Sequence, residues 1–160
     1  MNSDLIFRNK KIRQNRPIIP NDKLYSIFEN NGVFQICFRS RGCSNYLAGS
    51  CIMCDYGLGT NITKEELELA FDKALSESKQ EIKILLLNAY GSILDTNEIS
   101  EECFTALLEK LKKTNINRII FETHYNTITE EKLKLIKEEL NDKIICFELG
   151  FETSNEEIRT

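Results

Sequence analysis

Lys83-Ile84-Leu85-Leu86-Leu87-Asn88-Ala89-Tyr90-Gly91-Ser92 is the stretch that decides the fold of this chain. It opens with a continuous apolar run, which is typical of a β-strand covered on both faces. Polar residues and a glycine follow, and they predict a turn at the carboxyl end of that strand. Strands covered on both faces belong to parallel sheets, so the stretch predicts an α/β protein.

Helical segments flank this strand along the chain. Thr63-Lys-Glu-Glu66 has the pattern of a capping box, in which the threonine and the last glutamate each bond the other's backbone. Ser100 and the two acids after it predict the start of the next helix, because negative charge is favoured at a helix N-terminus. Both segments carry apolar residues at helical spacing, namely Leu67, Ala70, Phe71, Ala74 and Leu75, then Phe104, Leu107, Leu108 and Leu111.

Three further apolar segments are predicted strands, at residues 33–38, 118–121 and 144–149. A predicted helix capped by Thr129 lies between the last two. Strand and helix therefore alternate, with connections of a few residues. That order requires crossover connections, so we expect a parallel sheet with helices outside it.

The two ends of the chain differ from this regular pattern. Residues 1–30 are polar with short apolar interruptions and contain both prolines, so we expect an N-terminal extension followed by a core domain at residues 31–160. Ser154 and the residues after it predict another helix start. A closed eight-stranded barrel needs ~250 residues. We therefore expect the N-terminal half of a barrel in a truncated or split chain, with a complete small α/β domain as the alternative.

Composition limits the class of protein. Of 160 residues, 41% are apolar and 29% charged, as in a soluble globular domain, and the net charge of −4 gives no overall attraction to nucleic acid. No apolar run approaches the ~20 residues of a membrane span, and the N-terminus lacks a secretion signal, so we expect a cytoplasmic protein without membrane contact. In a reducing cytosol a disulfide framework is not expected. Cys37, Cys103 and Cys146, within apolar segments, are predicted to be buried free thiols.

The other three cysteines form a possible metal site in the segment after the first predicted strand. Cys43, Cys51 and Cys54 have the spacing C-x7-C-x2-C among several glycines. Three thiolates can hold three irons of a cubane cluster and leave the fourth iron open to a second molecule. Zinc is the rival, but structural zinc usually takes four ligands, often as two Cys-x2-Cys pairs. The chain has one such pair and one histidine, His124, which favours iron and sulfur.

Four polar segments follow the four predicted strands. They are the cysteine loop and residues 88–95, 122–126 and 148–153. Ligands of parallel α/β sheets bind outside the carboxyl ends of the strands. The chain therefore predicts one face with thiolates, a glycine turn open to close approach and several carboxylates. His124 lies there either as a site residue or as a loop side chain.

Together these segments resemble the radical S-adenosylmethionine superfamily, in the branch of the elongator catalytic subunit and the archaeosine-synthase radical subunit. Four motifs over roughly residues 33–158 carry the resemblance: Arg41-Gly-Cys43, Cys51-Ile-Met-Cys-Asp-Tyr56, Asn88-Ala-Tyr-Gly-Ser-Ile-Leu-Asp95 and Glu148-Leu-Gly-Phe-Glu-Thr153. It implies a partial (βα)6 barrel similar to a TIM barrel. It also implies a 4Fe–4S cluster on Cys43, Cys51 and Cys54, whose open iron chelates S-adenosyl-L-methionine.

The resemblance further implies that the reduced cluster cleaves S-adenosylmethionine to a 5′-deoxyadenosyl radical, with no side chain as acid or base. The cofactor contacts that it implies are Asn88, Gly91 and Ser92 at the methionine moiety, Glu122 at its positive charge, and Glu152 and Thr153 at the ribose. A turn, a salt bridge and a helix cap are the respective structural alternatives.

Partners follow from the same resemblance. They are a reductant of the flavodoxin or ferredoxin type, a substrate that is transfer RNA or a small molecule, and a second polypeptide that completes the barrel. The alternative function is a non-enzymatic metal-binding or partner-dependent interaction module with a structural zinc or iron–sulfur site.

Overall fold

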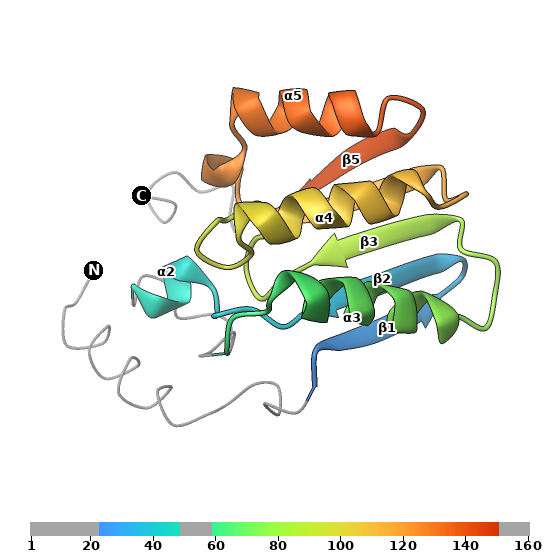
Figure 1. Cartoon of the computed structure of the whole chain (residues 1–160), viewed down its shortest axis with the longest axis horizontal. Helices are drawn as coiled ribbons and strands as arrows, with labels where there is room; N and C mark the ends of the chain where they lie inside the picture. The colour runs from blue at the N-terminus through green and yellow to red at the C-terminus, as the bar shows by residue number, and fades with distance from the viewer. Residues whose placement is uncertain (1–22, 49–58, 151–160) are drawn as a thin grey trace.

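The computed structural model describes residues 23–48 and 59–150. Five strands form one sheet in the order of the chain: β1 (Tyr25–Asn30), β2 (Val33–Phe38), β3 (Ile84–Asn88), β4 (Arg118–Thr123) and β5 (Ile144–Leu149). Successive parallel strands are joined through α3 (Lys64–Ser76), α4 (Glu101–Lys112) and α5 (Glu130–Glu139) (Figure 1). Two short helical segments, α2 (Ser44–Leu47) and the 3-10 helix η1 (Tyr125–Thr127), follow β2 and β4.

Strands β2 to β5 are parallel to one another, which confirms the predicted α/β class with outer helices. The helices α3, α4 and α5 lie on one face of the sheet (Figure 1). The side chains beneath them are fully buried and form the core: Phe34, Ile36, Phe38, Leu85, Leu87, Ile119 and Phe121. Burial of these alternate strand residues fixes which face of each strand the helices cover.

The helices begin at the predicted caps. The Thr63 hydroxyl accepts a hydrogen bond from the backbone N–H of Glu66 at 3.2 Å, and the Glu66 carboxylate accepts one from the Thr63 N–H at 3.0 Å. The hydroxyls of Ser100 and Thr129 cap α4 and α5 by accepting from the backbone N–H groups of Cys103 and Lys132. Local capping signals therefore place all three crossover helices.

Strand β1 belongs to the sheet although it lies within the predicted N-terminal extension. It pairs antiparallel with β2, from Tyr25 opposite Phe38 to Asn30 opposite Val33. Asn31 and Gly32 connect the two strands with φ values of 49° and 80°, as a type I′ hairpin turn requires. The Asn-Gly pair was the sequence signal for this hairpin.

The opposite face of the sheet, called the open face below, carries no helix among the described residues (Figure 1). Leu86 of β3 points to this face and is only partly buried. Among the described residues, helices therefore cover one face of β3, not both as the sequence predicted. Cys146 of β5 is exposed for the same reason, and the prediction that it is buried was wrong. Cys37 is partly buried and Cys103 is buried.

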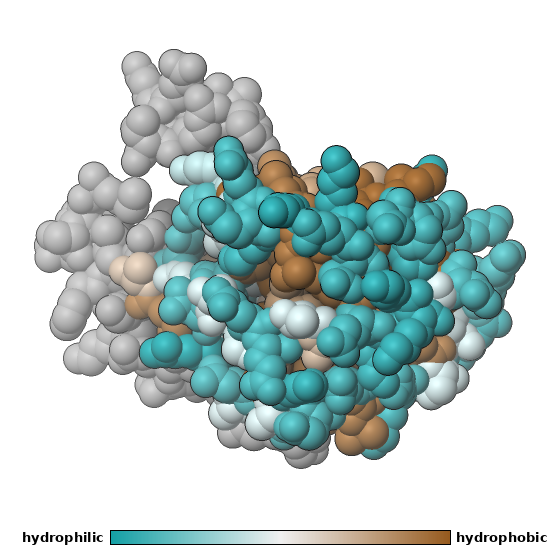
Figure 2. Space-filling model, turned by 45° about the horizontal axis from the view of Figure 1, so that its top comes forward, coloured by the Kyte–Doolittle hydropathy of each residue, from teal (hydrophilic) through white to brown (hydrophobic). Residues whose placement is uncertain are grey.

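The surface over the helices is mainly hydrophilic, with apolar atoms visible between the polar side chains (Figure 2). Within residues 23–48 and 59–150, no helix has both the length and the apolar character that crossing a membrane requires.

Truncation of a core leucine tests this packing. Leu87 is 0% exposed, so Leu87→Ala should lower the free energy of unfolding by about 2–5 kcal/mol through lost burial and a cavity. Leu69 on α3 is 47% exposed, so Leu69→Ala should cost less than about 1 kcal/mol. Urea unfolding followed by circular dichroism measures both. Equal losses would contradict the assignment of Leu87 to the core.

Candidate functional site at the carboxyl edge of the sheet

Loops that leave β2, β3 and β4 meet at one edge of the sheet, with Cys43 between them. Cys43 is the N-cap residue of α2 and is 3% exposed. Its neighbour Ser44 donates its hydroxyl to the Asp95 carboxylate at 2.6 Å, which ties α2 to the loop after β3. The first of the three predicted thiol ligands is thus placed at the edge where the sequence predicted a site.

A buried carboxylate, Glu98, joins the loops after β2 and β3. It is 3% exposed and accepts hydrogen bonds from the backbone N–H groups of Gly91 at 2.9 Å and Ser92 at 3.0 Å. The Ser40 hydroxyl donates to it at 3.2 Å. Burial raises the pKa of Glu98 to about 7, the Asp95 carboxylate adds to the rise, and the hydrogen bonds oppose it.

Gly91 has a steric reason to be glycine in this structure. A Cβ atom there would lie 2.6 Å from the Cys43 sulfur and 2.6 Å from a Glu98 carboxylate oxygen. Both distances are far below van der Waals contact, so the close approach of the two loops requires a residue without a side chain. The predicted contact of Gly91 with a methionine moiety stays a prediction.

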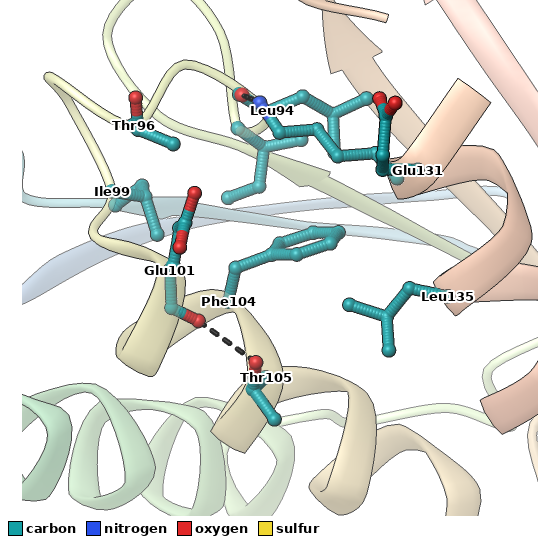
Figure 3. A pocket seen from close by; sticks show the side chains of 10 residues that line it. Leu94, Thr96, Ile99, Glu101, Phe104, Thr105, Glu131 and Leu135 are labelled. Carbon is teal, nitrogen blue, oxygen red and sulfur yellow. Dashed lines mark hydrogen bonds between the residues drawn. The ribbon is translucent and has the colours of Figure 1, made fainter. Parts of the chain in front are cut away.

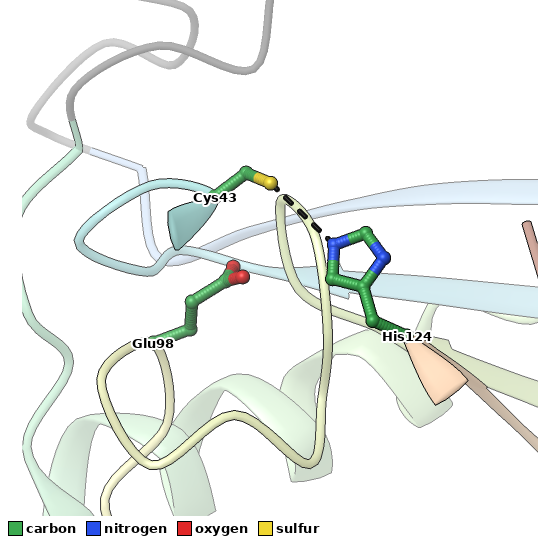
Figure 4. Close-up of side chains that lie close together, drawn as sticks. All are labelled: Cys43, Glu98 and His124. Atoms are coloured by element: carbon green, nitrogen blue, oxygen red, sulfur yellow. Dashed lines mark hydrogen bonds between the residues drawn. The ribbon is translucent and has the colours of Figure 1, made fainter. Parts of the chain in front are cut away.

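His124, the residue directly after β4, reaches the same point from the third loop. Its Nε2 atom lies 3.5 Å from the Cys43 sulfur (Figure 4). One ligand-type atom from each of Cys43, Glu98 and His124 lies within 4.8 Å of the other two. Thiolate, imidazole and carboxylate are all metal ligands, so the cluster of side chains has the composition of a metal site.

Glu98 was missed by sequence reasoning. It lies seven residues after Gly91, in a loop where no motif or spacing distinguishes it from other surface acids. Its role arises only when that loop folds back on the glycine turn. His124 was named as a candidate because it follows a strand, and the structure brings it to Cys43.

The side chain of Ser92 is buried and points toward the loop after β4. Its hydroxyl lies 2.8 Å from the Thr127 hydroxyl and also bonds the Thr123 hydroxyl. The two threonine hydroxyls are 2.8 Å apart. The three hydroxyls thus join the loops after β3 and β4, and the predicted bond from Ser92 to the cofactor stays a prediction.

Asn88 and Glu122 lie next to each other on the open face, at the ends of β3 and β4. The side-chain oxygen of Asn88 accepts a hydrogen bond from the side-chain amide of Gln35 at 3.3 Å. Burial raises the pKa of Glu122, the neighbouring Glu148 carboxylate adds to the rise, and a hydrogen bond from Asn88 lowers it. In the described part of the chain no lysine or arginine forms a salt bridge with Glu122, so that structural alternative is not realised there.

Four of the predicted site residues lie outside the described residues: Cys51, Cys54, Glu152 and Thr153. Their roles stay predictions.

A cavity of about 220 Å³ lies apart from these residues, between α4, α5 and the loop after β3 (Figure 3). Its walls are mostly apolar side chains such as Leu94, Phe104 and Leu135, and none of the predicted site residues lines it. Lys132 crosses its edge and donates to the backbone carbonyls of Leu94 and Thr127. The cavity is best described as a packing gap between two helix ends.

Comparisons with known proteins identify two relatives of this chain. No family model matches the chain. It is 30% identical to an uncharacterized protein of Methanocaldococcus jannaschii, over 95% of this chain and 45% of that protein. It is 29% identical to archaeosine synthase subunit beta of Methanosarcina acetivorans, over 78% of this chain and 37% of that subunit. The chain spans less than half the length of both relatives.

A solved structure shares the fold. Queuine lyase from Clostridium spiroforme, bound to SAM and queuine, superposes with a TM-score of 0.58 at 24% identity, over 86% of this chain and 56% of that chain. The chain is therefore related to the radical S-adenosylmethionine superfamily, and the resemblance drawn from its motifs is confirmed.

Gly91→Ala tests the contact between the loops. The added methyl group overlaps Cys43 and Glu98, so we expect a loss of about 1–3 kcal/mol in the free energy of unfolding. Asn45→Ala, at an exposed position of α2, is the control and should change stability by less than about 0.5 kcal/mol. An unchanged urea midpoint in Gly91→Ala would show that the loops do not pack as described.

Glu122→Gln should stabilise the protein increasingly as pH rises. The pKa of Glu122 in the folded protein lies above its ordinary value of 4.5. The protonated carboxyl group therefore stabilises the folded wild type fully below pH 4.5, and this stabilisation is lost as the pH rises through the folded-state pKa. The difference in urea midpoint between variant and wild type should therefore be larger at pH 8 than at pH 4. Glu109→Gln, at an exposed position of α4, is the matched control for the loss of one carboxylate. A pH-independent difference for Glu122→Gln would refute the assignment.

Proposed function

We propose that the chain is the cofactor-binding part of a radical S-adenosylmethionine enzyme, with a 4Fe–4S cluster on Cys43, Cys51 and Cys54. The observation that carries the proposal is the burial of Cys43 where the loops after β2, β3 and β4 meet. A thiol among converging backbone loops suits an iron–sulfur cluster, because soft thiolates are the preferred ligands of such clusters. When bound and reduced, the cluster supplies the electron that cleaves S-adenosylmethionine to a 5′-deoxyadenosyl radical.

The chain's own residues bind and position in this proposal. Glu98 and Gly91 hold the backbone around Cys43 through the hydrogen bonds and the close contact described above. The carboxyl edge and the open face beside it, with Asn88 and Glu122, receive S-adenosylmethionine. The Glu122 carboxylate, which forms no salt bridge with a lysine or arginine of residues 23–48 and 59–150, suits the positive charge of that cofactor. Ser92 at the methionine moiety, and Glu152 and Thr153 at the ribose, are the remaining proposed contacts.

Substrate and partners are proposed from the relatives. One relative is named as a synthase subunit, which supports a second polypeptide as partner, and the structural neighbour is bound to SAM and queuine. We therefore assign as substrate a nucleobase-containing molecule, either transfer RNA or a small molecule. A flavodoxin or ferredoxin supplies electrons, and the cytoplasm is the proposed location. The proposed core domain comprises residues 31–160 together with β1, which pairs with β2 in the same sheet.

A second candidate function is a metal-binding or interaction module without catalysis. The observation that favours it is the cluster of Cys43, Glu98 and His124, whose thiol, carboxylate and imidazole would also suit zinc. The metal bound after reconstitution distinguishes the two candidates.

Anaerobic reconstitution with iron and sulfide tests the proposed function. We expect a brown protein with about four irons per chain, as a cubane cluster requires. Cys51→Ala should lose most of the iron and colour, whereas Cys146→Ala, which removes an exposed thiol on the open face, should retain both. The iron-loaded protein, but not the metal-free protein, should retain radiolabelled S-adenosylmethionine in equilibrium dialysis. A colourless protein with one zinc per chain would contradict the enzymatic proposal and favour the second candidate.

A further inference from the structure

Hydrogen bonds to the backbone carbonyl group of His124 hold this residue in place, in addition to the contact that its ring makes. Its carbonyl oxygen accepts from the backbone N–H of Thr127 at 3.1 Å and from the Thr127 hydroxyl at 2.7 Å. The Thr127 hydroxyl in turn contacts the hydroxyls of Ser92 and Thr123. The imidazole is therefore presented from a turn that is fixed to the loop after β3, the loop that also packs against Cys43.

The imidazole ring of His124 contacts Cys43, which is distant from it in the sequence. The 3.5 Å from Nε2 to the sulfur is within hydrogen-bond range for sulfur, and 81 residues separate the two positions. Because Cys43 is 3% exposed, little water competes for the sulfur on the side that His124 occupies. Contacts of this kind orient a metal ligand and tune its electronic properties when the sulfur holds a metal.

Glu98, a second polar side chain near Cys43 among the described residues, already has its hydrogen-bond partners. Its two carboxylate oxygens accept from Gly91, Ser92 and Ser40. A Cβ atom on Gly91 would overlap both Glu98 and the Cys43 sulfur, so both side chains lie against this glycine. Glu98 is thus a loop-positioning residue, and His124 is the neighbour whose ring nitrogen points at the sulfur (Figure 4).

We propose that His124 donates a hydrogen bond from Nε2 to the Cys43 thiolate and thereby raises the reduction potential of the cluster that this thiolate holds. The inference rests on the proposed function, because it needs an iron–sulfur cluster on Cys43. Reduction adds negative charge to the cluster and its sulfur ligands. An N–H donor to a ligand sulfur therefore stabilises the reduced form more than the oxidised form. His124 acts through Cys43 and is a positioning residue with an electrostatic effect.

Redox titration of the reconstituted full chain, monitored by electron paramagnetic resonance at one fixed pH, tests the inference. His124→Leu removes the donor, and His124→Gln retains an N–H donor at nearly the same reach. We expect about a tenfold fall in the ratio of reduced to oxidised cluster for His124→Leu at a fixed electrode potential, which is about 59 mV for one electron. His124→Gln should stay close to the wild type. Tyr125→Leu, a change at a 79% exposed neighbour in the same loop, is the matched control and should leave the potential unchanged.

A second measurement needs no variant. His124 is the only histidine in the chain, so incorporation of 15N-histidine labels this residue alone. Electron–nuclear double resonance of the reduced cluster should then show a weak coupling to the labelled nitrogen, and an exchangeable proton that disappears in deuterated buffer. Absence of both signals in an iron-loaded sample would overturn the inference even if His124→Leu failed to fold.

The outcomes separate this inference from the proposed function. Equal potentials in wild type and His124→Leu, with full iron content in both, overturn the role of His124 and leave the cluster in place. A strong nitrogen coupling, with loss of iron in His124→Leu and in His124→Gln, makes His124 a metal ligand and also overturns the inference. A wild-type chain that binds no iron refutes the proposed function and the inference together.

Discussion

A carboxylate buried at the edge of a parallel sheet is the constraint on which the site depends. Glu98 is taken out of water, which costs several kcal/mol unless its oxygens are hydrogen-bonded. Its donors are two successive backbone N–H groups after β3 and a hydroxyl from the loop after β2. Satisfying this one side chain therefore sets the relative position of two loops that no secondary structure connects. Cys43 is placed by that arrangement.

Two kinds of interaction stabilise different parts of the molecule. Burial of apolar side chains between the sheet and α3, α4 and α5 fixes the register and spacing of the strands. Hydrogen bonds among short polar side chains then fix the loops, as in the contacts of Thr127 with Ser92 and Thr123. Ser92 and Thr123 are buried and Thr127 is partly buried, and the bonds among their hydroxyls fix the two loops to each other. A reactive group carried by these loops is thus positioned by rigid elements.

The sequence allowed prediction of the features that depend on local pattern. Caps at Thr63, Ser100 and Thr129 placed the helices, and apolar runs placed the four parallel strands, since both signals act over a few residues. The edge that carries Cys43, Gly91 and His124 followed from the rule that parallel strands end together. Features that depend on long-range contact were missed: the role of Glu98, the engagement of the Ser92 hydroxyl and the exposure of Cys146 on the open face. Strand β1 was missed for a different reason. The residues around it are polar, and the Asn31-Gly32 pair was not used to predict a hairpin turn.

The identity of strand order with chain order has a consequence for how the protein reaches its native state. Each parallel strand pairs with the one that precedes it, so no pairing waits for a distant part of the chain to arrive. A crossover to the next strand of the chain closes a shorter loop than a crossover to a later strand would, and the cost in loop-closure entropy is smaller. Each β-strand with its following helix can therefore add to the units already formed, and the nascent sheet can grow in the direction of synthesis. The loops that surround Cys43 come from three such units, so the pocket for the sulfur is completed only after β4 has joined the sheet.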